Sequence, residues 1–272
     1  MPELPEVEHA ARMLRGFLTG RVIRRAEASP TRVFRGGDRR AFASALRGRK
    51  LERLERRGKY LLLSFDGGVS VLSHLGMTGK WIRREGQRER RPLYSRARLT
   101  LDDDSVVHYC DPRLFGRIAV HRGKDLDRLP EIRALGPDPL RDGIDPRALA
   151  EVLARTSRPI KVALMDQRVI AGVGNIQATE ALFRARVAPT RPAHHVSARE
   201  VARIAKAIRA SIDFTLEAAG PDEITYLSEG ARVVNPFLVY GREGSPCPRC
   251  RQPIDTISLA GRSSAHCASC QR

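Results

Sequence analysis

The sequence lacks any long apolar stretch, and nothing in it approaches the run of about 18 apolar residues that a membrane-spanning helix needs. It also lacks the basic and then apolar start of a secretory signal peptide. We find no internal repeat and no low-complexity tract. We therefore expect a soluble intracellular protein, and its 272 residues suffice for one large domain or two smaller ones with real cores.

Acidic residues are scarce relative to basic ones, with 31 Asp and Glu against 49 Lys and Arg, a net charge of +18. Such an excess in a folded protein indicates a polyanionic partner, most often nucleic acid. Arg outnumbers Lys, and its planar guanidinium suits phosphate recognition. A solubility surface or the codon bias of a high-GC genome would give the same excess, so charge alone leaves these alternatives open.

Cysteine is also rare, with five residues, four of them in CPRC (247–250) and CASC (267–270). Sixteen residues separate the two pairs, which is the spacing of a zinc ribbon. We predict one structural zinc ion on four thiolates, from Cys247, Cys250, Cys267 and Cys270. Disulfides are the weaker alternative without a secretion signal. Cys110 stands alone in a predicted strand, where we expect a buried apolar role.

Apolar periodicity predicts an N-terminal helix and then a β domain. Residues 3–18 place Leu4, Val7, Ala11, Leu14 and Leu18 on one helical face. Residues 20–122 then predict strands, including hairpins in 59–75 and 97–110 and a strand in 117–122. Residues 83–92 are expected to form a charged loop. This part of the chain predicts a β-sandwich or a barrel-like domain.

Residues 135–146 are rich in Pro, Gly and Asp and predict a linker. Helices follow it. Asp145-Pro146 predicts the start of a helix. Residues 197–200 (SARE) predict a capping box at the start of another, and Gly220-Pro221 predicts where that helix ends. Residues 160–187 predict two helical segments broken by AGVGN, with Asn175 as N-cap of the second. Such a helix start can bind a phosphate, although an ordinary helical hairpin would look the same.

Seven motifs together resemble one family, the bacterial formamidopyrimidine-DNA glycosylases, which are relatives of endonuclease VIII. In chain order the motifs are MPELPEVE, RRGKYLLL (56–63), HLGMTG (74–79), DPRLFG (111–116), LGPDPL (135–140), AGVGNIQATEALF (171–183) and GRSSAHCASCQ (261–271). The resemblance implies an α+β multidomain fold: an N-terminal β-sandwich with flanking helices, a helical helix-two-turn-helix domain and a C-terminal β-hairpin zinc finger. We expect a catalytic domain at 1–134, a linker at 135–146, the helical domain at 147–240 and the finger at 241–272.

The resemblance also implies a bifunctional DNA glycosylase and AP lyase of base excision repair. Removal of Met1 would make Pro2 a terminal secondary amine, and terminal amines have a pKa of about 8. Such an amine can attack C1′ of a damaged nucleotide and form an iminium, from which β- and δ-elimination follow. Glu3 would act as acid and base at the sugar. Lys59 and Arg262 match positions that protonate during the two eliminations, with a phosphate contact as the alternative for Lys59 and a solvated arginine as the alternative for Arg262.

A base inside a duplex must be flipped out before it can be excised, and the vacated space must be filled. Met77, Arg113 and Phe115 match the family's void-filling residues, although by their own pattern Met77 and Phe115 would be core residues. The other expected DNA-binding residues each match, or lie near, a position that binds a phosphate or contacts DNA in the family; they are His74, Tyr94, Arg158, Lys161 and Asn175. We expect a monomer that binds damaged double-stranded DNA, has no membrane partner and is cytoplasmic, associated with the bacterial nucleoid through DNA.

The chain departs from the family pattern at Leu114, Tyr94, Gln177 and residues 220–237, the last in place of the loop that covers 8-oxoguanine in typical members. These departures leave the preferred base open among 8-oxoguanine, ring-opened purines and oxidised pyrimidines. A non-catalytic paralogue that binds lesions without cutting is the alternative from another functional class. Retention of Pro2 and Glu3 argues against it.

Overall fold

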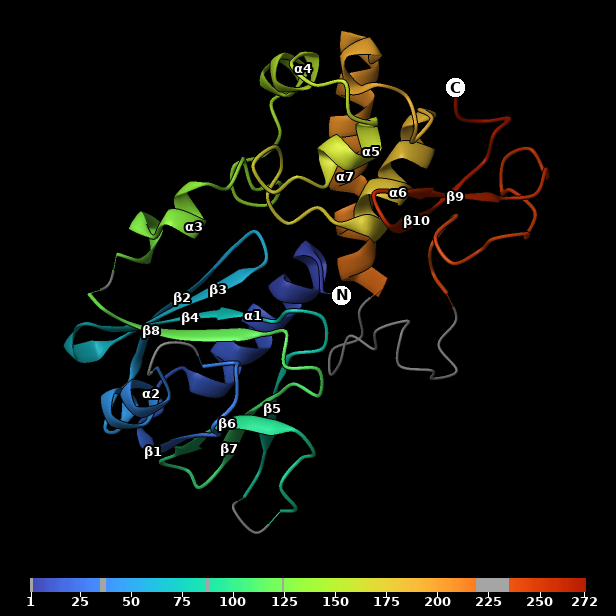
Figure 1. Ribbon diagram of the computed structural model, residues 1–272. Helices are drawn as coiled ribbons and strands as arrows, with labels where there is room; N and C mark the ends of the chain where they lie inside the picture. Colours follow the sequence, from blue (N-terminus) through green and yellow to red (C-terminus); the bar gives the residue numbers. More distant parts are fainter. Residues whose placement is uncertain (1, 35–37, 87–88, 124, 219–234) are drawn as a thin grey trace. The chain divides into compact units, whose positions relative to one another are not determined.

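The computed structural model describes residues 2–34, 38–86, 89–123, 125–218 and 235–272. The chain divides into two compact units (Figure 1). Unit 1 consists of Met1–Pro2 and Glu6–Arg133, and unit 2 of Glu3–Pro5 and Ala134–Arg272. Among the described residues, no helix is both long enough and apolar enough to cross a membrane.

Unit 1 contains two antiparallel four-stranded sheets. One has the order β2-β3-β4-β8, with β2 at Leu51–Arg57, β3 at Tyr60–Phe65, β4 at Val69–His74 and β8 at Arg117–Arg122. The other has the order β1-β6-β7-β5, with β1 at Ile23–Ala28, β6 at Ser95–Leu101, β7 at Val106–Cys110 and β5 at Lys80–Arg84. The predicted hairpins are confirmed as β3–β4 and β6–β7. The predicted charged loop at 83–92 begins two residues too early, because Arg83 and Arg84 pair with β7.

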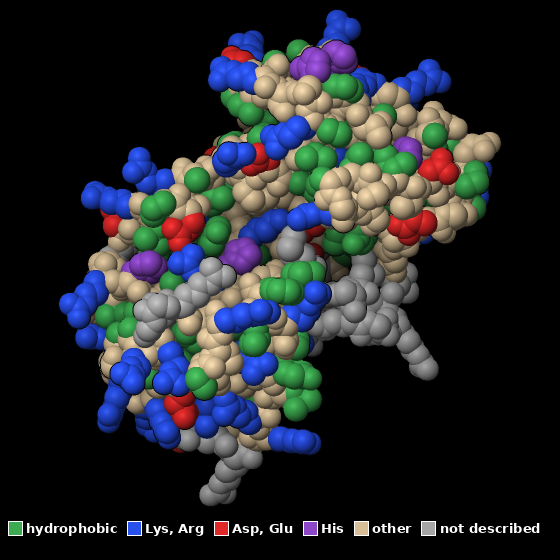
Figure 2. Space-filling view, in the orientation of Figure 1, with side chains coloured by type: hydrophobic (Ala, Val, Ile, Leu, Met, Phe, Trp, Pro, Cys, Tyr) green, Lys and Arg blue, Asp and Glu red, His purple; other side chains and the backbone are tan. Residues whose placement is uncertain are grey.

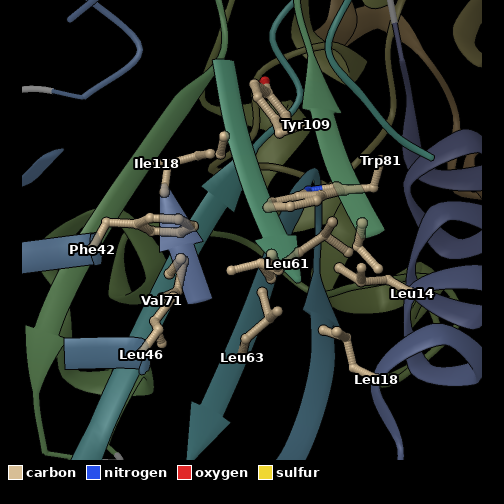
Figure 3. Packing of buried hydrophobic residues seen from close by; sticks show 14 of the residues in the cluster. Leu14, Leu18, Phe42, Leu46, Leu61, Leu63, Val71, Trp81, Tyr109 and Ile118 are labelled. Atoms are coloured by element: carbon tan, nitrogen blue, oxygen red, sulfur yellow. The ribbon is translucent and has the colours of Figure 1, made fainter. Parts of the chain in front are cut away.

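The two sheets share one apolar core, so the unit is a sandwich (Figure 3). Helix α1 (Leu4–Leu18) contributes Leu14 and Leu18, and α2 (Asp38–Leu46) contributes Phe42 and Leu46. These side chains meet β-branched, aliphatic and aromatic residues that alternate along the strands, as a half-buried sheet requires. The predicted apolar face of α1 is confirmed, since Leu4, Val7, Ala11, Leu14 and Leu18 are all buried. The sheet also buries Cys110, whose pKa is raised to about 11 by burial, so the thiol is inert as expected.

Unit 2 is helical, with a C-terminal strand pair. Its helices are α4 (Pro146–Ala154), α5 (Ile160–Leu164), α6 (Asn175–Ala185) and α7 (Ala198–Ala218), whereas the short helix α3 (Pro130–Arg133) ends unit 1. The predicted helix start at Asp145-Pro146 is confirmed, because the Asp145 carboxylate accepts from Arg147 N. The predicted capping box is confirmed as well: Ser197 and Glu200 exchange hydrogen bonds in both directions. The predicted stop at Gly220-Pro221 lies outside the described residues.

Strands β9 (Asp255–Leu259) and β10 (Arg262–His266) form the predicted C-terminal hairpin. Ala260 and Gly261 turn it, and both have positive φ, as a two-residue hairpin turn requires. β10 packs against α6. Between the first two cysteines, Arg249 donates to the carbonyls of Phe183 and Arg184 at 2.6 and 3.2 Å, which caps the C-terminal end of α6.

Candidate functional site

The turn that precedes α6 holds the carboxylate of Glu3. Glu3 is 2% exposed, and its carboxylate accepts from the backbone N–H groups of Gly174, Ile176 and Gln177 at 3.1, 2.8 and 3.0 Å. These are the donors that an α-helix leaves without intrahelical partners at its start. The prediction that Asn175 is the N-cap is wrong. Gly174 takes that position in extended backbone, with φ −132° and ψ −156°, and the acceptor comes from Glu3.

Gly174 is required for space at this turn. A Cβ there would overlap the carboxyl group of Glu3, so only glycine lets the acidic side chain approach the helix start. Gly172 has φ +87° and faces Leu4, whose N–H donates to Gly172 O at 3.0 Å. Gln167 fixes the turn from the other side: it donates to Val173 O at 2.8 Å and accepts from Gly172 N at 2.8 Å.

A buried polar network continues from the same helix start. Gln177 is fully buried, donates to Thr215 Oγ1 at 2.9 Å and accepts from Ser211 Oγ at 2.7 Å. The amide therefore joins α6 to α7 with both of its ends satisfied. Gln177 is one of the positions at which the sequence departs from the pattern of the family that it resembles, and its buried amide is fully hydrogen-bonded here.

Lys161 lies in α5, fully buried, and ties that helix to the C-terminal hairpin. Its Nζ donates to Ser263 O at 2.9 Å and to Ser264 Oγ at 2.6 Å. Burial lowers the pKa of Lys161 to about 8, helped by the charge of Arg262 and opposed by that of Glu3. Arg262, the first residue of β10, is exposed beside this contact. Lys161 thus touches the segment that presents Arg262, a role that sequence reasoning missed.

In unit 1, Lys59 directly precedes β3, and His74 ends the neighbouring strand β4. Lys59 is buried in the turn between β2 and β3, and His74 ends β4, with its ring 4.9 Å from that of Tyr60. Burial lowers the pKa of His74 to about 4, with smaller contributions from the charges of Lys59 and Arg117. His74 Nδ1 accepts from Gly76 N at 3.1 Å, so the neutral ring carries its proton on Nε2. His74 can therefore donate Nε2–H to a phosphate without carrying a charge.

Two loops of unit 1 carry the predicted void-filling residues, and both present them to solvent. Met77 is 36% exposed, Phe115 is 47% exposed and Arg113 is exposed. The structure thus contradicts the alternative in which Met77 and Phe115 are core residues. Their exposure makes both apolar side chains accessible to a partner.

Asp111 and Tyr109 lock these two loops together. The fully buried Asp111 carboxylate accepts from Thr78 Oγ1 at 2.7 Å, Arg113 N at 3.2 Å and Gly116 N at 2.8 Å. A Cβ on Gly116 would overlap the hydroxyl of Tyr109, so the loop needs glycine there. Sequence reasoning did not select Asp111. Its signal is the pattern Asp-Pro followed by glycine, in which a carboxylate can bond to the backbone two residues on.

The remaining predicted DNA-binding residues are Tyr94, whose carbonyl accepts from Asp111 N at 3.1 Å, and Arg158 and Asn175, which belong to unit 2. Tyr94 is 54% exposed, with φ 60° and the Arg96 guanidinium 5.6 Å from its ring centroid. Arg158 donates to Asp166 Oδ2 at 3.2 Å, so its charge already has a partner. Asn175 opens α6, and its Oδ1 is buried without a hydrogen-bond partner among the described residues.

The four predicted zinc ligands are brought together. The Sγ atoms of Cys247, Cys250, Cys267 and Cys270 all lie within 4.8 Å of one another. A tetrahedral zinc with Zn–S bonds of about 2.3 Å requires sulfurs about 3.8 Å apart. The pairs Cys247–Cys270 and Cys250–Cys267 lie 3.9 and 3.4 Å apart, so the set fits one such ion with no open position for a substrate.

Basic side chains also gather on the surface. Figure 2 shows Lys and Arg side chains over the visible face of unit 1 with few carboxylates between them. Several arginines of unit 1 are paired with acids, among them Arg24 with Asp104 at 3.2 Å and Arg98 with Glu27 at 3.5 Å. The remaining excess of positive charge gives the positive electrostatic potential expected of a protein that binds a polyanion.

Comparison with known proteins gives matches along the whole chain. Residues 1–118 match the formamidopyrimidine-DNA glycosylase N-terminal domain, residues 135–224 the H2TH domain of the same enzymes, and residues 244–272 a zinc finger found in FPG and IleRS. The formamidopyrimidine-DNA glycosylase of Thermus thermophilus is 38% identical over 276 residues, covering 100% of this chain and 98% of the relative. That of Geobacillus kaustophilus is 36% identical and covers 100% of both chains.

Solved structures agree with these matches. The crystal structure of the MutM (Fpg) protein from Thermus thermophilus superposes with a TM-score of 0.83 at 36% identity, covering 99% of this chain and 98% of that one. Lactococcus lactis Fpg, in complex with DNA that contains N7-benzyl-Fapy-dG, gives a TM-score of 0.89 at 28% identity and full coverage of both chains.

Proposed function

This chain belongs to the formamidopyrimidine-DNA glycosylase family and is a base-excision-repair DNA glycosylase with AP lyase activity, and we propose that Pro2 is its nucleophile. Removal of Met1 frees the secondary amine of Pro2. Its lone pair attacks C1′ of the damaged nucleotide, and the base leaves with the electrons of the C1′–N bond. The nitrogen then loses its proton, and its restored lone pair opens the C1′–O4′ bond to an iminium while O4′ takes up a proton. This cation has no N–H proton to lose, so it draws electrons from the sugar.

The geometry of Glu3 is the observation that carries this proposal. Glu3 follows Pro2 directly in the chain, and three backbone N–H groups fix its carboxylate. A carboxylate buried at 2% exposure next to the nucleophile in the chain is suited to take up the proton that the attacking amine releases and to hand it to O4′ as the ring opens. Preorganisation of this kind keeps the catalytic group from moving during the reaction.

Lys59 and Arg262 are proposed to serve the eliminations that follow. The iminium acidifies the C2′ proton, whose loss expels the 3′ phosphate, and a second elimination expels the 5′ phosphate. Each leaving phosphate needs a cation or a proton donor. The buried Lys59 and the exposed Arg262, at the tip of a rigid hairpin, supply suitable groups.

We propose that duplex DNA is held by His74, Tyr94, Arg158, Lys161 and Asn175, while Met77, Arg113 and Phe115 fill the space left by the flipped nucleotide. For Lys161 the contact would be through the hairpin that it holds, because its ammonium is buried. We further propose a catalytic domain at 1–134, a linker at 135–146, a helix-two-turn-helix domain at 147–240 and a zinc finger at 241–272. The protein is proposed to act as a cytoplasmic monomer on oxidised and ring-opened bases.

Borohydride trapping tests the proposal. Protein with Met1 removed, verified by mass spectrometry, is mixed with an oligonucleotide that carries an abasic site, and sodium borohydride reduces any iminium to a stable adduct. We expect an adduct whose peptide map places the DNA on Pro2. Protein that binds the DNA but forms no adduct would overturn the nucleophile assignment and favour a non-catalytic paralogue.

A panel of duplexes containing 8-oxoguanine, formamidopyrimidine or an oxidised pyrimidine then ranks the substrates. Excision of oxidised pyrimidines well ahead of both purine lesions would favour the alternative in which the same chemistry prefers oxidised pyrimidines. Pro2→Gly, which keeps a terminal amine of the primary type, is the matched control for the secondary amine.

A further inference from the structure

The side chain of Arg32 is hydrogen-bonded to the backbone of the 113–115 segment, which carries two of the predicted void-filling residues. Its Nε donates to Leu114 O and its Nη2 donates to Arg113 O, each at 2.9 Å. Its Cζ also lies 5.2 Å from the ring centroid of Phe115. Arg113 Cζ lies 4.9 Å from the same centroid, so two guanidinium groups stack on one exposed aromatic ring.

The backbone that carries Arg32 is fixed. Val33 and Phe34, which follow it, are buried in the core of unit 1. Val33 O accepts from Ile118 N at 2.9 Å, and Phe34 forms a bridge with Ile118 in β8. Arg32 therefore projects from a rigid base toward the loop.

The loop needs such support. Leu114 has φ 58°, in the left-handed region that a leucine disfavours. Asp111 holds the two ends of the loop through Arg113 N and Gly116 N, but it does not reach the carbonyls between them. Arg32 bonds those carbonyls. One planar guanidinium can donate to two carbonyls and stack on a ring at once, whereas a lysine ammonium cannot.

We propose that Arg32 is a positioning residue for recognition of the base opposite the lesion. It holds the backbone of 113–115 so that Phe115 enters the stack and Arg113 reaches the orphaned base. This inference rests on the proposed role of Arg113 and Phe115. It makes no claim on the chemistry at Pro2.

The experiment compares Arg32→Ala, Arg32→Lys and Arg113→Ala with Arg24→Ala, which removes one exposed, paired arginine from the same unit. Affinity is measured for duplexes carrying a tetrahydrofuran abasic analogue opposite each of the four bases, across a range of salt concentrations. Borohydride trapping on a single-stranded abasic oligonucleotide, which has no opposite base, shows whether the chemistry is intact.

We expect both Arg32 variants to weaken duplex binding roughly three- to tenfold, because both hydrogen bonds are exposed and water replaces part of what each contributes. We also expect the ratio of affinities between the best and worst opposite base to move toward one, as in Arg113→Ala. The salt slope and single-strand trapping should match the wild type. Arg24→Ala should leave the opposite-base ratio unchanged.

Two results would overturn the inference. If Arg32→Lys restores wild-type binding while Arg32→Ala lowers the salt slope by about one unit, Arg32 is a phosphate contact. If Arg113→Ala alters the opposite-base ratio but neither Arg32 variant does, Arg32 does not position the loop. An unchanged ratio in Arg113→Ala would instead show that the proposed function of that residue is wrong, and the inference would fall with it.

Discussion

Gly174→Ala tests whether the approach of Glu3 to the start of α6 matters for catalysis. The backbone of Gly174, with φ −132° and ψ −156°, lies in a region that alanine adopts freely. The substitution therefore adds one methyl group and no backbone strain. That methyl would overlap the carboxyl carbon and Cγ of Glu3, and the acidic side chain must move away.

The cost follows from the bonds that Glu3 would lose. It accepts three backbone N–H donors between 2.8 and 3.1 Å, and a hydrogen bond to a charged group contributes about 1.5–3 kcal/mol. Water can replace part of this, so we expect a loss of roughly 2–4 kcal/mol in the free energy of unfolding. Because a displacement of about 1 Å in a catalytic group can cost about 100-fold in rate, base excision should fall by about that factor.

The assay separates excision from attack by the amine. Single-turnover excision from a lesion duplex reports the step that needs Glu3, whereas borohydride trapping on a preformed abasic site reports Pro2. We expect the first to fall about 100-fold and the second to fall much less. Gly16→Ala is the matched control, because a Cβ there meets nothing within 4 Å and should leave both activities unchanged.

Wild-type excision rates in a folded Gly174→Ala protein would refute this reasoning. Equal losses in excision and trapping, accompanied by unfolding at the assay temperature, would show a fold effect only. In that case Glu3→Gln, which keeps the shape of the side chain and one of its two acceptor oxygens, becomes the deciding variant.

Three further predictions follow from single groups. Burial lowers the pKa of His74 to about 4, whereas an unfolded histidine has a pKa of about 6.5, so the free energy of unfolding falls as pH drops from about 6.5 to 4. In urea titrations His74→Asn should lose up to about 3 kcal/mol less than the wild type over this pH range. An unchanged dependence of stability on pH would contradict the burial argument. Arg262→Ala should reduce the slope of log affinity against log salt by about one unit if Arg262 meets a phosphate, and an unchanged slope would exclude that contact. The purified protein should hold one zinc per chain; Cys270→Ser should lose it together with the amide-exchange protection of β9 and β10, and retained protection would show that the hairpin folds without metal.

Local patterns in the sequence predicted those elements that depend only on interactions between residues close together in the chain. The face of α1, the hairpins of the sandwich, the Asp145 and Ser197 caps and the four-cysteine cluster depend on spacing and on neighbours within a few residues. Each of them is present as expected. The family resemblance, in turn, selected Met77 and Phe115 against their own apolar character, and their exposure supports that choice.

Long-range contacts could not be predicted from the same patterns. Asn175 has the chemistry of an N-cap, but the acceptor at that helix start comes from Glu3, more than 170 residues away in the chain. Gly174 looks like a residue that permits a turn, and its actual use is to leave room for that carboxylate. Arg249 lies between two zinc-ligand cysteines, and nothing in its local sequence indicates that it caps the end of α6.

These contacts converge on one helix. The start of α6 binds Glu3, its middle carries the fully buried Glu180, and its end is capped by Arg249 from the first zinc-ligand pair. The Glu180 carboxylate accepts from Leu238 N, Val239 N and Tyr240 N, between 2.9 and 3.0 Å, and so fixes the chain just before the finger.

Loss of the metal should therefore change the structure of α6 as well as that of the segments that carry the cysteines. Without zinc, the loop that carries Arg249 has no fixed geometry, and the carbonyls at the end of α6 lose their donors. If α6 is a rigid rod, only its last turn should loosen, and excision should fall no more than DNA affinity does. If instead the helix shifts as a unit, the Glu3 contacts at its start should weaken too, and chelation should reduce excision more than binding. Hydrogen exchange at Ile176 and Gln177 N–H, measured with and without zinc, decides between these two responses.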